Sequence, residues 1–143
     1  AWNVVNLNGT PYHMDVTWDI GAINKNMSSL PYDYFNVSDE LVYKDHKADC
    51  KLPVCGSLEM NYFTKNKLVF SSKLRLLAYM EKVVASGQVE FYFRVEGKLM
   101  EPRVFQQICD LVKRYVLDNN KLKIQYTQNE NIGIFKIKFI SKT

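Results

Sequence analysis

The stretch "AWNVVNLNGTPYHMDVTWD", residues 1–19, decides how the first half of the chain is expected to fold. Two runs of strand-forming residues flank Asn8-Gly9, which is the strongest short signal for a β-hairpin. Both of these residues tolerate the positive φ that a type I′ turn requires. The stretch therefore predicts a hairpin over residues 3–18 with a two-residue turn at Asn8-Gly9.

The register set by this turn decides where Asp15 lies. A two-residue turn pairs Leu7 with Thr10, and hence Trp2 with Asp15 further along the ladder. The carboxylate of Asp15 and the indole of Trp2 are then expected on one face, whereas a three-residue turn would reverse the parity. Since Asp is disfavoured in strands, a carboxylate here indicates a function. The alternative is a solvent-facing side chain.

Length and composition restrict the class of protein. With 143 residues, 47% of them hydrophobic, the chain can bury one sizeable core or two small ones. The net charge of +4 comes from basic and acidic residues that are interleaved, so we expect no nucleic-acid partner. No run of about 18 apolar residues occurs, so we expect no insertion into a membrane.

The second half of the chain carries regular patterns in the order α-β-α-β-β from about residue 71. A helix is predicted over 72–87 and a second one from Pro102, and strands are predicted over 88–95, 121–127 and 132–140. In the first helix, the residues at helical spacing are Leu74, Leu77, Met80 or Glu81, and Val84. We expect an α+β module whose two helices cover one face of a small sheet.

Residues 19–70 are irregular apart from one predicted short helix, which follows Ser38 and has Asp39 and Glu40 in its first turn. The patterns therefore predict two domains, at 1–65 and 66–143.

Four segments together resemble the transglutaminase-like family of bacterial proteins: "AWN" at 1–3, "DVTWD" at 15–19, "PYDYFNVSDELVYKDH" at 31–46 and "LPVCGSLEMNYFTKN" at 52–66. In that family a His precedes the Ala-Trp pair, and the "DVTWD" segment supplies the catalytic Asp. The resemblance implies that residues 1–65 are the C-terminal half of a transglutaminase-like, papain-like core. Residues 66–143 would then be a small α+β accessory domain.

The resemblance also implies a Cys-His-Asp triad that performs acyl transfer or amide hydrolysis on protein or peptide carboxamides. Asp15 is the one triad member that maps onto this chain, with the His expected just before Ala1 and the Cys further upstream. Trp2 is expected to wall the substrate cleft, with a buried sheet residue as the alternative. The chain alone is expected to be inactive, and no cofactor is implied.

The remaining histidines and cysteines are expected to carry no chemistry. His13 is interpreted as a polar surface residue. His46, Cys50 and Cys55 have only Asp45 and Asp49 nearby to complete a ligand set, so we expect no metal site. Cys50 and Cys55 are interpreted as free loop thiols, with a disulfide as the alternative in a secreted parent, and Cys109 as a core residue.

Two other hypotheses stay open. The region from about residue 71 could be a non-catalytic protein-binding or structural module, which an exposed apolar sheet face would favour and a polar one would not. A third hypothesis is self-association through an unpaired sheet edge where upstream strands belong. The compartment is open, and a secreted or cell-surface parent is one option.

Overall fold

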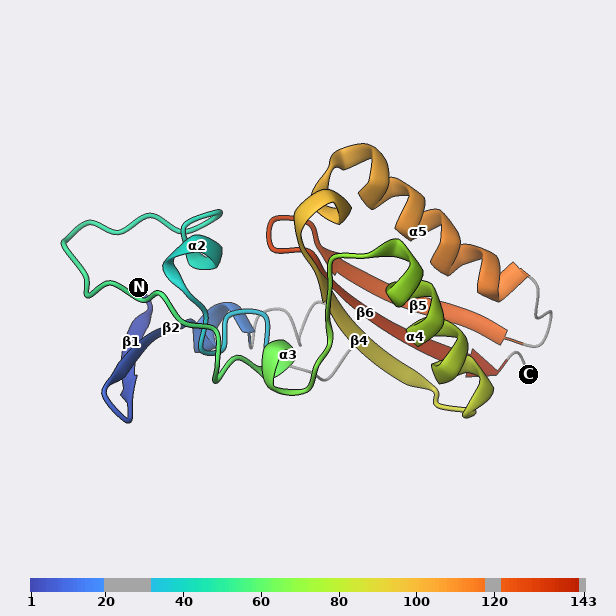
Figure 1. Cartoon of the computed structure of the whole chain (residues 1–143), viewed down its shortest axis with the longest axis horizontal. Coiled ribbons are helices and arrows are strands. Elements are labelled where there is room, and N and C mark those ends of the chain that lie inside the picture. Colours follow the sequence, from blue (N-terminus) through green and yellow to red (C-terminus); the bar gives the residue numbers. More distant parts are fainter. Residues whose placement is uncertain (20–31, 118–121, 142–143) are drawn as a thin grey trace. The chain divides into compact units, whose positions relative to one another are not determined.

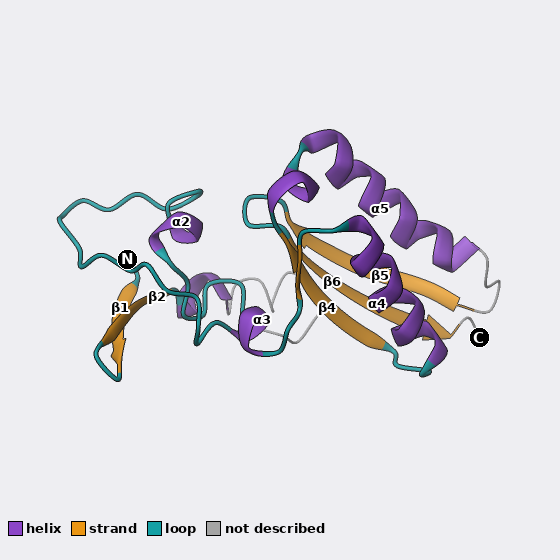
Figure 2. Cartoon of the chain, viewed as in Figure 1, coloured by secondary structure: helices purple, strands orange, loops and turns teal. Residues whose placement is uncertain are grey.

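The computed structural model describes residues 1–19, 32–117 and 122–141, and it divides the chain into two compact units (Figure 1). Unit 1 comprises Ala1–Leu68 with Asn129–Ile132, and unit 2 comprises Val69–Gln128 with Gly133–Thr143. Helices and strands occur in both units, with a two-stranded and a four-stranded sheet (Figure 2). The predicted α+β class is confirmed. The assignment of the two halves as a catalytic core and an accessory domain stays a prediction.

The predicted hairpin and its register are confirmed in unit 1. Strands β1 (Asn3–Leu7) and β2 (Thr10–Met14) pair antiparallel, with Leu7 opposite Thr10 and Asn3 opposite Met14. Asn8 and Gly9 have φ values of 54° and 86°, as a type I′ turn needs. The parity on which the position of Asp15 depends is therefore the expected one.

The strand predicted to continue to Trp18 ends earlier, at Met14. Residues 16–19 are helical, and Asp15 caps them. Its Oδ1 accepts a hydrogen bond from the Trp18 amide at 3.0 Å, and its backbone carbonyl accepts from the Asp19 amide at 3.2 Å. Asp is a preferred capping residue, so its preference for helix starts outweighs the strand pattern. The capping role gives Asp15 a structural reason to be at this position.

Most of the remaining described residues of unit 1 lie in loops and turns (Figure 2). Helix α2 (Asp39–Val42) follows Ser38 as predicted. Helix α3 (Tyr62–Lys65) was not expected, and it begins where the Asn61 side chain accepts hydrogen bonds from two backbone amides. The backbone of Val37 exchanges two hydrogen bonds with that of His13, at 2.9 and 3.0 Å. This pairing fixes one edge of β2 against the irregular chain.

Unit 2 contains helices α4 (Lys73–Ala85) and α5 (Pro102–Leu117), the 3-10 turn η1 (Gly97–Met100), and strands β3 (Val69–Phe70), β4 (Glu90–Val95), β5 (Leu122–Asn129) and β6 (Ile134–Ser141). The strand order is β3-β4-β6-β5, with β3 parallel and β6 antiparallel to β4. Both helices cover one face of this sheet (Figure 1). The short strand β3 is the element that the sequence patterns missed.

The core of unit 2 lies between this sheet face and the two helices. The alternation predicted for β4 is confirmed, since Phe91, Phe93 and Val95 are all buried. The buried residues of the helices are Leu76, Met80, Val83, Phe105, Ile108, Cys109 and Val112. The stripe predicted for α4 is confirmed only in part, because Met80 is buried whereas Leu74 is 79% exposed and Val84 is 44% exposed. The helix carries apolar residues on two faces, and packing against the sheet selects the one with Leu76.

The second face of this sheet is polar. Glu90 on β4 lies opposite Lys138 on β6, and their charged groups are 3.5 Å apart. The Tyr92 hydroxyl donates to the other oxygen of Glu90 at 2.7 Å. Arg94 pairs with Glu96 at 3.4 Å. Because these groups are charged and paired, the described part of this face along β4 and β6 does not offer the apolar patch that a docking module would favour.

Candidate functional site

Asp15 is buried at the end of β2, with only 2% of its surface exposed. Its Oδ2 lies 2.7 Å from Nε2 of His46, the residue that follows the turn after α2. Its backbone amide donates to the carbonyl of Tyr34 at 2.9 Å. The carboxylate therefore has two partners, the Trp18 amide on one oxygen and an imidazole on the other.

The imidazole of His46 lies between two carboxylates. Its Nδ1 is 2.7 Å from Oδ1 of Asp45, while its Nε2 contacts Asp15. Ionised carboxylates only accept hydrogen bonds. Each ring nitrogen of His46 is therefore placed to donate to a carboxylate whenever it carries a proton. The arrangement is a buried, hydrogen-bonded Asp-His-Asp group.

Tyr34 extends this group on the far side of Asp45, to which its hydroxyl donates a hydrogen bond. The same hydroxyl accepts from the Asn129 side chain at 3.0 Å. Burial is the largest cause that raises the pKa of Tyr34 above its ordinary value; the Asn129 hydrogen bond lowers it in part, and Asp45 raises it further. The phenol therefore stays protonated and remains a donor to Asp45 at neutral pH.

Three aromatic rings surround His46. The ring centroid of Trp2 lies 4.9 Å from that of His46, that of Trp18 4.0 Å away, and that of Tyr34 4.8 Å away. Trp2 and Asp15 thus contact the same imidazole, as the hairpin parity predicts. Trp18 is 47% exposed, so an aromatic surface continues from the buried group to solvent. Whether Trp2 supports a substrate cleft stays a prediction.

His13 is not the polar surface residue that the sequence suggested, because it is fully buried. Its Nδ1 accepts a hydrogen bond from the Trp2 indole at 3.1 Å, and its Nε2 lies 2.6 Å from Oδ1 of Asp39. An indole N–H can only donate, so Nδ1 is the acceptor and Nε2 carries the proton given to Asp39. The chain between Tyr32 and Cys55 covers the side of the hairpin that carries His13. Because this segment has no periodic pattern, its sequence did not predict that it would bury the histidine.

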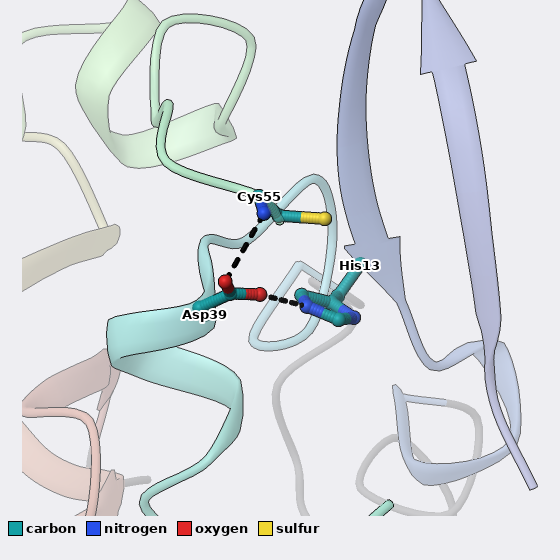
Figure 3. A group of neighbouring side chains, drawn as sticks. All are labelled: His13, Asp39 and Cys55. Atoms are coloured by element: carbon teal, nitrogen blue, oxygen red, sulfur yellow. Dashed lines mark hydrogen bonds and ion pairs between the residues drawn. The ribbon is translucent and has the colours of Figure 1, made fainter. Parts of the chain in front are cut away.

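Cys55 completes a second cluster with His13 and Asp39 (Figure 3). Its backbone amide donates to Oδ2 of Asp39 at 3.1 Å. One potential ligand atom from each of the three residues lies within 4.8 Å of the other two. Burial, and then the negative charge of Asp39, raise the pKa of the Cys55 thiol. The thiol is therefore neutral as it stands, unlike an activated nucleophile.

His46, Cys50 and Cys55, which the sequence analysis weighed as one possible ligand set, lie in different places in the structure. His46 belongs to the Asp15 group, Cys55 to the His13 cluster, and Cys50 is exposed. No disulfide joins Cys50, Cys55 or Cys109, and the predicted burial of Cys109 is confirmed.

Sequence reasoning missed the partners of both buried histidines, His46 and His13. The signal available was weak: Asp45-His46 directly follows a predicted short helix, and Asp39 begins it. A charged residue in such a loop is usually solvated. The sequence pattern therefore did not mark Asp39 or Asp45 as the buried partner of a histidine.

Comparison with known proteins identifies no relative: a scan against protein-family models and a search of curated proteins both return no match. In the part of the chain that the structure describes, no helix combines the length and apolar character of a membrane span.

Proposed function

We propose that unit 1 is the C-terminal half of a transglutaminase-like core and that Asp15 is the carboxylate of its Cys-His-Asp site. By the order of the family's triad, the thiol and the imidazole of that site would lie before Ala1. The observation that carries the proposal is the environment of Asp15. Its carboxylate is buried, shares a side with Trp2, and binds an imidazole nitrogen at 2.7 Å.

A carboxylate that orients a catalytic imidazole must be held rigidly and must have room to accept one more N–H. The Trp18 amide fixes one oxygen of Asp15 and His46 fixes the other. An ionised carboxylate offers about four lone-pair sites, so two remain for the triad His.

The proposed reaction is thiol-dependent acyl transfer on a protein or peptide carboxamide. The Cys sulfur attacks the amide carbon, and the His transfers the thiol proton to the departing amine, which leaves as ammonia. Water or a second amine then releases the acyl group from the thioester and regenerates the thiol. Asp15 stabilises the imidazolium during both steps and does not itself take the proton.

The alternative of a non-catalytic binding or structural module has less support. Its clearest form needs an apolar face on unit 2, and the second face of that sheet carries the paired charges of Glu90, Lys138 and Arg94. Unit 2 fits better as an accessory domain that packs on its own core.

The proposal is tested by comparing the 143-residue chain with a longer protein. A longer version that includes the natural residues before Ala1 should release ammonia from glutamine peptides or attach a fluorescent amine to them. The 143-residue chain should do neither, because triad members act as a unit. Robust activity of the 143-residue chain alone, or none in any longer version, would contradict the proposal.

A further inference from the structure

We propose that His13, Asp39 and Cys55 form a binding site for a divalent transition metal ion of the zinc or cobalt class. The site is separate from the Asp15 group, and the inference does not depend on the proposed function. Its ligands would be one imidazole nitrogen, one carboxylate oxygen and one thiolate sulfur.

Three different parts of unit 1 deliver these groups to one place (Figure 3). His13 comes from β2, Asp39 from the first residue of α2, and Cys55 from the loop before α3. The potential ligand atoms lie within 4.8 Å of one another. In a tetrahedral zinc site ligand atoms are spaced by roughly 3.3–3.8 Å, given metal–ligand bonds of about 2.0–2.3 Å. Side-chain adjustments of an ångström or so are enough to close the site.

The ligand types select the metal. A thiolate with an imidazole suits zinc or cobalt, whereas calcium and magnesium prefer oxygen ligands alone. Three protein ligands would leave a fourth position for water, as in catalytic rather than structural zinc sites. The ion would enter past Asp39, whose side chain is 31% exposed, since His13 and Cys55 are buried.

Metal binding would replace the hydrogen bonds of this cluster in a defined way. The Cys55 thiol loses one proton to solvent as the sulfur–metal bond forms. The Nε2 proton of His13 moves to Nδ1, so that Nε2 offers its lone pair. Trp2 must then release Nδ1, because two N–H groups cannot face each other. Trp2 is only partly buried and can turn its indole toward water.

Trp2 therefore competes with the metal for the tautomer of His13. Its hydrogen bond of 3.1 Å holds His13 in the form that donates to Asp39 rather than the form that binds metal. Trp2→Phe, which removes the indole N–H, is expected to tighten metal binding several-fold. This effect distinguishes binding at His13 from binding at any other histidine.

The experiment is a titration of the untagged, reduced 143-residue chain with Co²⁺, followed by the near-ultraviolet absorption that a cobalt–thiolate bond produces. One equivalent should bind, and Zn²⁺ should displace it. Cys55→Ser should abolish the band, and His13→Gln or Asp39→Asn should weaken binding at least about tenfold. Cys50→Ser and Cys109→Ser are the matched controls and should leave the band in place.

Two outcomes overturn the proposal. The first is a wild-type chain that shows no saturable thiolate band at millimolar Co²⁺, which would leave the cluster as a hydrogen-bond network only. The second is a band that disappears in Cys50→Ser and persists in Cys55→Ser. The wild-type titration and the Trp2→Phe variant decide the matter even if a core variant fails to fold, which circular dichroism would reveal.

Discussion

Nε2 of His46 and Oδ2 of Asp15 lie 2.7 Å apart, although the two residues are 31 positions apart in the chain. A second carboxylate, that of Asp45, holds the other nitrogen of the ring at 2.7 Å. This Asp-His-Asp group joins the hairpin to the irregular chain beyond it. Its removal should therefore affect both the fold of unit 1 and the position of Asp15.

His46→Gln is expected to destabilise the protein by about 3–5 kcal/mol, because it leaves two buried carboxylates without the imidazole that contacts both of them. The free energy of unfolding from urea denaturation measures this loss. Lys47→Gln, at the exposed neighbouring position, is the control and should change stability by less than about 0.5 kcal/mol. Equal effects of the two substitutions would show that the buried group carries no net stability.

Tyr34 predicts an alkaline limit to stability. Since burial raises its pKa in the folded state, the stability linked to its proton is complete below the ordinary tyrosine pKa of about 10 and is lost as the pH rises above it. Tyr34→Phe should therefore be less stable at pH 8 but show a shallower fall in unfolding free energy between about pH 10 and 11. Parallel curves for the two proteins would contradict the assignment.

The cysteines should differ in reactivity. Burial and Asp39 raise the pKa of Cys55, so its reactive thiolate is scarce, whereas Cys50 is exposed. Iodoacetamide should label Cys50 at least about tenfold faster than Cys55 in the folded protein, as mass spectrometry of the peptides would measure. In denaturant the two rates should converge. Equal rates without denaturant would mean that Cys55 is accessible.

Gly133 tests the packing of unit 2. It has φ of +72°, and an added Cβ would lie 2.6 Å from the carbonyl oxygen of Val95 and 2.4 Å from the sulfur of Met100. Gly133→Ala should cost more than about 1 kcal/mol of unfolding free energy. Gly56→Ala, where a Cβ would meet nothing within 4 Å, is the control and should stay within about 0.5 kcal/mol.

The features that the sequence predicted correctly depend on local signals such as turn residues, alternation of apolar side chains and helix starts. Asn8-Gly9 determined the hairpin register, and hence the shared side of Trp2 and Asp15, through turn geometry alone. In unit 2, the alternation of Phe91 and Phe93 and the start at Pro102 gave the strand and the helix for similar reasons. Each of these features depends on residues that are neighbours in sequence.

The rest depended on contacts between distant residues. The end of β2 was misplaced because Asp15 caps a helical turn. The hydrogen bond to this cap forms only when residues 16–19 are helical, so the strand pattern alone did not show it. The partners of Asp15 and His13 come from residues 39–46, in a region with little periodic pattern. Long-range pairing of single polar residues leaves no repeat in the sequence.

The most direct measurement of the central claim is the transamidation rate of the longer protein with Asp15→Asn compared with Asp39→Asn. Asn is also a good helix cap, so the first substitution keeps an acceptor for the Trp18 amide while removing the charge that orients the imidazole. The proposal predicts a loss of about 10⁴-fold in kcat/KM for Asp15→Asn and less than about tenfold for Asp39→Asn, whose carboxylate binds a different histidine. Near-wild-type activity of a folded Asp15→Asn protein would contradict it.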